Sequence, residues 1–157
     1  MTTHQFTTAC CCCVVVALAA CEPAPPPTPF KPVATTKQVM AEVLEPAADT
    51  YWDAVGSTSD KDGIHEHAPK NDDEWKAVIA SATVIAESGN LLMMTPRALN
   101  QGEWMTLARE MVDAGVQART AAQAHDVQKV FDAGAAVYES CTKCHAKYVI
   151  AAASKPK

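Results

Sequence analysis

The sequence has few aromatic residues and little glycine, and no segment shows a convincing strand pattern. Aromatic residues make up 6% of the 157 residues, and six residues are glycine. Alanine, by contrast, is frequent, especially after residue 76. Alanine is the strongest helix former, whereas strands favour aromatic and β-branched residues. The composition therefore predicts a mainly helical protein, and the length suits a single domain.

Cysteine is missing from the long stretch between Cys21 and Cys141, although the chain contains seven cysteines. The others are Cys10 to Cys13, in an apolar N-terminal segment, and Cys144 near the opposite end. This distribution excludes a disulfide framework, which needs cysteines spread through the fold. An excess of positive charge is missing too, since the formal net charge is -5. We therefore expect no nucleic-acid partner.

Lysine and arginine are absent from residues 1–8, which precede an apolar run at residues 9–21. The run is too short to span a bilayer as a helix, and it matches the apolar region of a signal peptide. Its end, Leu18-Ala19-Ala20-Cys21, resembles a bacterial lipoprotein box, which implies cleavage before Cys21 and lipidation of its thiol. We expect a lipoprotein-type signal at residues 1–20, although a typical signal carries positive charge at its start. The alternative is a secretory signal without lipid, cut after Ala20 or Ala24, and either signal exports the domain.

Residues 21–35 are rich in proline, with six prolines between Pro23 and Pro32. Such a segment supports neither helix nor sheet hydrogen bonding and favours an extended polyproline conformation. At about 3.1 Å per residue it predicts a tether of roughly 30–40 Å between a membrane and the domain. Simple disorder without a spacer role is the alternative.

Four later segments repeat apolar residues at helical spacing. They lie at residues 36–55, 72–94 and 101–123, and from Val127 to Tyr148. A capping box at Thr35-Thr36-Lys37-Gln38 and a cap at Asn71 mark two of the starts, and Pro46 should kink or break the first helix. Residues 57–70 suit a loop, in which His65-Glu66-His67 gives a metal site as a minor alternative. We predict an all-α fold, an antiparallel four-helix bundle over residues 36–150, with a tail at residues 151–157.

The last helical segment contains Cys141-Thr142-Lys143-Cys144-His145. Cys-x-x-Cys-His is the attachment signature of a c-type haem. The two thiols, one turn apart on a helix, can add to the two vinyl groups of the haem, and the histidine lies under the iron as its proximal ligand. Both cysteines and the histidine fall on the predicted apolar face of the helix. The sequence therefore predicts one covalent haem c, held on the core side of the C-terminal helix.

Two other sites can use these residues. A thioredoxin-like Cys-x-x-Cys pair belongs at a helix N-terminus after a strand, where the helix dipole lowers the pKa of a thiol. Here the pair lies deep in a helix without a preceding strand. A structural zinc site needs four ligands, which usually include a second distant pair, and the folded part of the sequence has none. The position of the cysteine pair within a helix argues against the redox pair, and the missing ligands argue against zinc. Both observations favour the haem site.

A four-helix chain with Cys-x-x-Cys-His near its C-terminus resembles the class II cytochromes c, which comprise cytochrome c′ and its low-spin relatives. The resemblance covers residues 36–150 and includes the pattern Tyr138-x-x-Cys141-x-x-Cys144-His145-x-x-Tyr148. It implies that Cys141 and Cys144 hold the haem and that His145 is the proximal ligand. It also implies that the first helix covers the other side of the iron.

Met40 lies on the inward stripe of that first helix, where low-spin members of the family carry a methionine ligand. By this resemblance Met40 is the expected distal ligand, and a thioether there favours ferrous iron. Packing is the alternative, because methionine fills cores well. The competitors are Met93, Met94, Met105 and Met111, of which Met93, on the inward face of the second helix, is the best and Met111 suits packing.

We therefore expect a periplasmic, lipid-anchored monohaem cytochrome c that carries single electrons by cycling Fe(III) and Fe(II). It is not expected to be an enzyme, because no base, nucleophile or substrate-binding cluster accompanies the haem motif. The expected partners are redox proteins and, through the lipid, a membrane; a homodimer stays open. Two alternatives remain. One is a cytochrome c′-like protein that binds NO or CO at five-coordinate iron, and the other is a haem-free helical lipoprotein.

Overall fold

A computed structural model describes residues 30–150 of the chain. The described residues from Pro32 onward belong to one compact unit. The predicted signal peptide, the lipidated Cys21, most of the proline-rich segment and the tail at residues 151–157 lie outside the described residues.

The first helical segment begins where the sequence predicts. It consists of α1 (Thr36–Gln38), the π-helical segment η1 (Val39–Leu44) and α2 (Glu45–Trp52). The predicted capping box is confirmed, since the Gln38 amide donates to Thr35 Oγ1 at 3.2 Å and the Thr35 amide donates to Gln38 Oε1 at 3.0 Å. These bonds satisfy two amides that a helix start leaves without partners.

Pro46 does not break this segment, which was one of the two outcomes predicted for it. A proline inside a helix lacks an amide hydrogen, and its ring crowds the carbonyl four residues earlier. The chain answers with the wider turn of η1, in which the Glu45 amide donates to the carbonyl of Met40, five residues back. A π-helical turn of this kind lets a helix continue past a local obstacle. It also sets the position of Met40 relative to α2.

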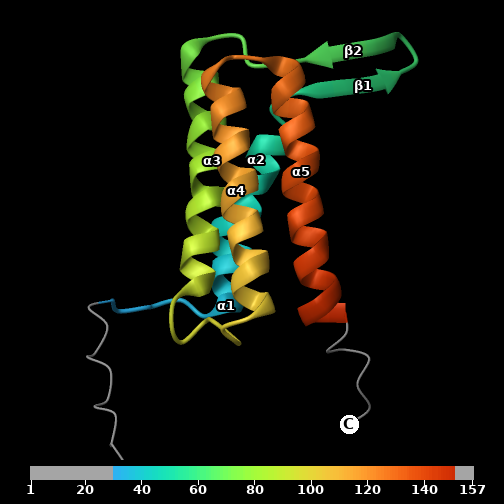
Figure 1. Ribbon diagram of the computed structural model, residues 1–157. Helices are drawn as coiled ribbons and strands as arrows, with labels where there is room; N and C mark the ends of the chain where they lie inside the picture. The colour runs from blue at the N-terminus through green and yellow to red at the C-terminus, as the bar shows by residue number, and fades with distance from the viewer. Residues whose placement is uncertain (1–29, 151–157) are drawn as a thin grey trace, which may run out of the picture. The chain divides into compact units, whose positions relative to one another are not determined.

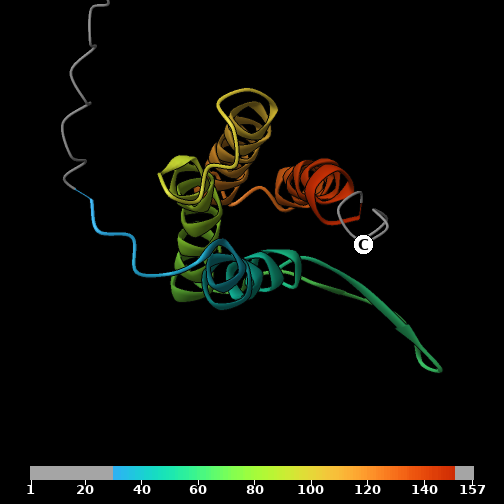
Figure 2. The same ribbon diagram turned by 90° about the horizontal axis from the view of Figure 1, so that it is seen from below.

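A β-hairpin replaces the loop predicted at residues 57–70. Its antiparallel strands are β1 (Gly56–Asp60) and β2 (Gly63–His67), and Gly56 pairs with His67 while Asp60 pairs with Gly63. A two-residue turn joins them, and Gly63 adopts a φ of 131°, which favours glycine. Both strands are almost entirely exposed, so they lack the alternation of apolar and polar residues that identifies strands in a sequence. Figures 1 and 2 show the hairpin extending away from the helices.

Three longer helices follow and agree with the predicted segments to within a few residues. They are α3 (Asp72–Met93), α4 (Glu103–Gln123) and α5 (Val127–His145), and the π-helical segment η2 (Ala146–Ile150) continues α5. The predicted cap of α3 is confirmed, because Asn71 Oδ1 accepts the amides of Asp73 and Glu74 at 3.0 Å each. The chain described is thus mostly helical, with one hairpin that the sequence analysis missed.

Helices α3 and α4 pack most closely. A Cβ added at Gly115 would lie 2.5 Å from the backbone nitrogen of Ala86, and one at Gly89 would lie 2.7 Å from the carbonyl oxygen of Ala108. These two glycines therefore let the two backbones approach each other. The core around this interface is rich in alanine, and its largest fully buried side chains include Tyr51, Ile85, Leu92, Val39, Val130 and Val137.

Helix α5 packs along α4 and touches the first helical segment mainly through two aromatic side chains. The Tyr51 hydroxyl lies 3.2 Å from the carbonyl oxygen of Ala118 and 3.3 Å from that of Val130, and it donates to this pair. Trp52 Nε1 donates to the carbonyl of Gly134 at 3.0 Å. Figure 2 shows α5 beside α4, with the first helical segment across from α5. We call the face between α2 and α5 the α2–α5 seam.

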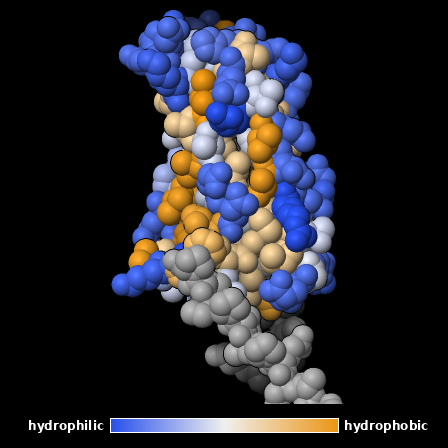
Figure 3. All heavy atoms as spheres, turned by 60° about the vertical axis from the view of Figure 1, so that its left-hand side comes forward, coloured by the Kyte–Doolittle hydropathy of each residue, from blue (hydrophilic) through white to orange (hydrophobic). Residues whose placement is uncertain are grey.

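The surface of the helical part is mixed in polarity. Figure 3 shows one side on which apolar side chains lie between hydrophilic ones, with the hydrophilic ones gathered at the upper end. Within residues 30–150, every helix is too short or too polar to cross a bilayer.

Candidate functional site

The Cys-x-x-Cys-His motif occupies the last turn of α5. Cys141 and Cys144 are half-buried free thiols, and His145 is exposed. The burial along α5 differs from the predicted stripe, because Phe131 is 59% exposed and Tyr138 is 64% exposed. The buried residues of α5 are Val130, Gly134, Val137 and Ser140, and Gly134 faces Tyr51 and Trp52 of α2. The exposed apolar residues of α5 form a second face, which borders the α2–α5 seam.

A groove of about 460 Å³ lies at the lower end of this seam. Leu44, Ala48 and Trp52 line it from the first helical segment, and His145 lines it from α5. Met40 faces the motif here, because Met40 and Cys141 line the same groove. The full lining comprises Met40, Leu44, Glu45, Ala48, Asp49, Trp52, Tyr138, Cys141, Thr142 and His145. We call this hollow the site groove.

A second hollow of about 30 Å³ lies next to the site groove on the core side. It shares Met40, Leu44, Cys141 and His145 with the groove, and Cys144 lines it as well. The structure therefore brings all four residues of the predicted haem site, from the two ends of the described chain, to one place. Whether Met40 binds iron stays a prediction.

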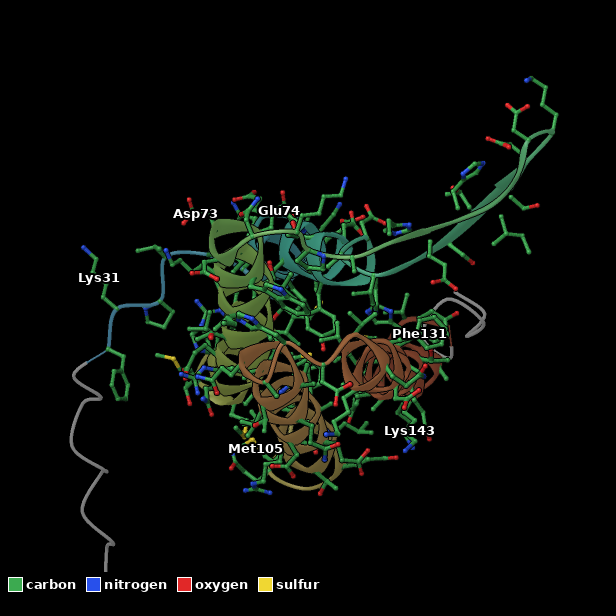
Figure 4. The ribbon with its side chains drawn as sticks, turned by 90° about the horizontal axis from the view of Figure 1, so that it is seen from above. Lys31, Asp73, Glu74, Met105, Phe131 and Lys143 are labelled. Atoms are coloured by element: carbon green, nitrogen blue, oxygen red, sulfur yellow. The ribbon has the colours of Figure 1, made fainter. Side chains whose placement is uncertain are left out.

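The competing methionines are placed differently from their ranking in the sequence. Met111 is buried, at 5% exposure, and lines the small hollow together with the motif residues. Met93 and Met94 line neither hollow. Figure 4 shows Met105 on a side of α4 that faces away from α5. Met111 is thus the methionine besides Met40 that lies at the motif, although the sequence indicated only packing for it.

Two residues of the groove, Leu44 and Ala48, were not assigned to the site from the sequence, whereas Trp52 was a candidate for the pocket lining. Leu44, Ala48 and Trp52 follow Met40 at steps of four residues, so they share its helical face. That spacing could have identified them once Met40 was placed at the site. They make the wall opposite α5 apolar.

Aromatic contacts lie at the site groove and after the motif. The rings of Trp52 and Tyr138, which both line the groove, meet edge to face across the seam, with centroids 6.1 Å apart. After the motif, the ring of Tyr148 meets Trp104 at 4.9 Å, and its hydroxyl oxygen accepts a hydrogen bond from Asn100 Nδ2 at 2.9 Å. The second contact anchors η2, and with it the end of the motif, to the α3–α4 connection.

The surroundings of both thiols raise their pKa. Burial raises the pKa of Cys141, and burial together with the neighbouring Cys141 thiol raises the pKa of Cys144. A thioredoxin-like pair needs the opposite shift, because the thiolate is the reactive species. The position at a helix C-terminus, where the dipole is negative, acts in the same direction as burial. The geometry therefore does not fit dithiol exchange chemistry.

The nearby lysines are engaged away from the groove. Lys143 Nζ lies 3.0 Å from Glu139 and 3.7 Å from Glu110 on α4, and Lys147 Nζ lies 2.8 Å from Glu103. The groove rim carries two exposed carboxylates instead, from Glu45 and Asp49.

The hairpin histidines do not join this site. His65 Nε2 lies 3.1 Å from Asp60 Oδ1, and His67 lines a separate hollow at the base of the hairpin. Over the described range, no group of three or more His, Cys, Asp or Glu side chains is arranged to hold a metal ion.

Comparison of the chain with protein-family models, with curated proteins and with solved structures found no significant match.

Proposed function

We propose that this protein is a monohaem c-type cytochrome that carries single electrons. The observation that supports the proposal most is the site groove. There Cys141, Cys144 and His145 on α5 meet Met40, a potential ligand from the far end of the described sequence, across an apolar hollow.

The residues present fit a covalently attached haem. The two thiols are free, half-buried and one helical turn apart, on the side of α5 that borders the hollow. The groove volume of about 460 Å³ falls within the range of about 300–1,000 Å³ that is usual for cofactor sites. Leu44, Ala48 and Trp52 supply the apolar wall that a porphyrin face needs. We assign the two thioether bonds to Cys141 and Cys144.

The proposed fold around this group is an antiparallel four-helix bundle. The order of contacts between α3 and α4 supports it, because Gly115 meets Ala86 whereas Trp104 Nε1 donates to the carbonyl of Leu92 at 2.8 Å. Residues nearer the start of α4 thus contact residues nearer the end of α3, as in an antiparallel pair. Short connections between helices favour the same arrangement.

Each residue has a definite role in this proposal. A c-type haem, when bound, supplies one-electron chemistry between Fe(III) and Fe(II). His145 would offer an imidazole nitrogen to the iron, and the Met40 thioether would offer a soft ligand that favours the ferrous state. Leu44 and Trp52, which line the groove, would exclude water from it once the haem is bound. A carrier needs no general base or nucleophile, and we propose none.

Location follows from the sequence alone. We propose that the signal at residues 1–20 exports the chain to the periplasm and that Cys21 carries a lipid anchor. Attachment of c-type haem outside the cytoplasmic membrane agrees with export, as the family resemblance implies.

A second function is favoured by the position of Leu44. Leu44 follows Met40 by one helical turn and lines both hollows at the motif. If Leu44 rather than Met40 covered the iron, the distal position would stay open. The protein would then be a five-coordinate, cytochrome c′-like protein that binds NO or CO.

Absorption spectra of matched leucine variants separate the two functions. Met40→Leu keeps the side-chain volume and removes the thioether, and Met111→Leu does the same on α4. For a carrier with Met40 bound, the wild-type ferrous spectrum is low-spin and unchanged by CO, and only Met40→Leu makes it CO-sensitive. A wild-type protein that is high-spin and binds CO readily contradicts the carrier. If Met111→Leu alone opens the site, Met40 is not the ligand.

A further inference from the structure

A second apolar hollow lies above the site groove in the α2–α5 seam. It measures about 350 Å³, and its lining includes Tyr51, Trp52, Phe131, Gly134 and Tyr138. It shares Trp52 and Tyr138 with the site groove, so the two hollows adjoin. The polar atoms of Tyr51 and Trp52 are already bonded to backbone carbonyls. The hollow therefore offers mainly apolar surface, and the hydroxyl of the exposed Tyr138 is the remaining side-chain polar group in its lining.

This hollow opens to solvent between exposed aromatic side chains. Phe131 and Tyr138 are 59% and 64% exposed, and Val127, one turn before Phe131, is 43% exposed. Exposed apolar residues that adjoin on one face mark interaction surfaces more often than isolated ones do. The next hollow along the seam, between α5 and the base of the hairpin, continues this surface through Val127 and Phe131.

Acidic side chains lie at the apolar surface: Glu45 and Asp49 line the adjoining site groove, and Glu66 lines the hollow at the base of the hairpin. Glu45, Asp49 and Asp53 follow one another at steps of four on the α2 side, and all three are exposed. Asp132 on α5 and Glu66 on the hairpin are exposed as well. Within residues 30–150, none of these five carboxylates forms an ion pair with a lysine, arginine or histidine.

The cations of α5 are held elsewhere. Lys129 pairs with Asp126 at 2.8 Å, and Lys143 pairs with Glu139 and Glu110 on the side toward α4. Figure 4 shows Phe131 on the side of α5 toward the hairpin and Lys143 on the opposite side of that helix. The α2–α5 seam therefore combines an apolar centre with an acidic border.

The apolar centre and acidic border of the seam indicate a positively charged partner. A second copy of the chain would bring one acidic border against another, which like-charge repulsion disfavours. A surface with an apolar side chain ringed by lysine and arginine would fill the hollow and pair with the border. Such complementarity speeds association and fixes the docking orientation.

We propose that the α2–α5 seam is the docking surface for a basic protein. An apolar side chain of that partner enters the hollow beside Phe131, and its lysines or arginines pair with Glu45, Asp49 and Asp53. The partner is a redox protein if the proposed function holds, because the site groove adjoins the seam. That identity rests on the proposed function, whereas the docking itself rests on the seam alone.

A synthetic peptide tests the docking directly. The probe is an amphipathic helical peptide of leucine and lysine, titrated by calorimetry into the purified mature protein. Two control peptides accompany it: one carries glutamate in place of lysine, and one has the same composition in a scrambled, non-amphipathic order. We expect binding of the first peptide only, and weaker binding when salt is raised to about 0.5 M.

Matched variants locate the binding on the protein. Glu45→Lys/Asp49→Lys reverses two charges on the seam and should weaken binding by about tenfold or more. Glu87→Lys/Asp113→Lys makes the same charge change at exposed positions on α3 and α4 and should change affinity by less than about threefold. Phe131→Ser should weaken binding by about fivefold or more, whereas Val116→Ser, at a similarly exposed apolar residue on α4, should not. Circular dichroism confirms that each variant is folded.

Several outcomes overturn the proposal. These are no binding of the basic peptide at low salt, equal binding of the glutamate or scrambled peptide, or equal losses in the seam variants and their controls. Self-association that Phe131→Ser abolishes, seen by analytical ultracentrifugation, would assign the seam to a second copy instead. The haem content of each sample is measured first. Absence of haem contradicts the proposed function, and the peptide titration still decides the docking.

Discussion

Replacing Gly115 by alanine tests the packing that positions the site. An added Cβ would lie 2.5 Å from the nitrogen, 2.7 Å from Cα and 2.8 Å from Cβ of Ala86. Carbon contacts are optimal at about 3.5–4.0 Å, so α3 and α4 must separate by about 1 Å to accept the methyl group. The atoms met are mainly backbone, which cannot turn aside as a side chain can.

The expected magnitude is a difference between two effects. Overpacking of this kind costs about 1–3 kcal/mol, and the clash with backbone places Gly115→Ala near the upper end. The better helix propensity of alanine returns about 1 kcal/mol. We therefore expect the free energy of unfolding to fall by about 2 kcal/mol.

Gly134→Ala is the matched control on α5. There the added Cβ would lie 3.2 Å from Cδ1 of Trp52, a side-chain atom that can move by a few tenths of an ångström. The gain in helix propensity should offset most of that contact, leaving a change within about 1 kcal/mol. Urea unfolding followed by circular dichroism measures both variants. If Gly115→Ala is as stable as Gly134→Ala, the close approach of α3 and α4 is not as described.

Three further predictions concern stability. Burial raises the pKa of Tyr51 to about 12. The contribution of its neutral hydroxyl to the free energy of unfolding is therefore complete below pH 10 and is lost between about pH 10 and 12. Tyr51→Phe should reduce the loss of unfolding free energy between pH 10 and 12 by about 2–3 kcal/mol. If the variant loses as much as the wild type, the loss does not come from Tyr51. Arg97, which is 6% exposed, donates to the carbonyls of Ala34 and Leu91. Arg97→Met should therefore lower the free energy of unfolding in urea by about 1–3 kcal/mol. No loss would mean that these hydrogen bonds are not stabilising. Lys147→Met breaks only an exposed ion pair, and a loss above about 1 kcal/mol would contradict that description.

Local signals in the sequence were sufficient for the helices. The cap at Asn71 and the capping box at Thr35 and Gln38 act within a few residues, so their hydrogen bonds can be predicted without tertiary information. The predicted alternative of a break at Pro46 does not occur, because the rule for proline assumes α-helical geometry. The rule does not apply to the wider π-helical turn of η1, and no pattern in the sequence predicts that turn.

The hairpin at residues 56–67 could not be predicted from hydrophobic patterning. Of its strand residues only Ile64 is a large apolar residue, and it is 75% exposed. Strand prediction relies on one buried face, which this hairpin does not have. Its glycine at a left-handed turn, Gly63, was the one local signal available.

The candidate site could also be predicted only as far as local spacing within a helix determines it. Spacing within one helix placed Cys141, Cys144 and His145 together, and family resemblance suggested Met40. The exposure of Phe131 and the position of Met111 depend on which side of α5 faces α4. That choice is made by packing between helices, and a helical stripe read from one helix alone cannot reveal it.

The most direct test of the account is the covalent haem content of the mature protein. The chain is exported in cells that carry the c-type maturation machinery, then purified and assayed by the pyridine haemochrome spectrum and by intact mass. The account predicts one covalently bound haem per chain, which Cys141→Ser/Cys144→Ser abolishes while the helical circular dichroism is retained. A folded wild-type chain without covalent haem, or with haem that survives loss of both thiols, would contradict it.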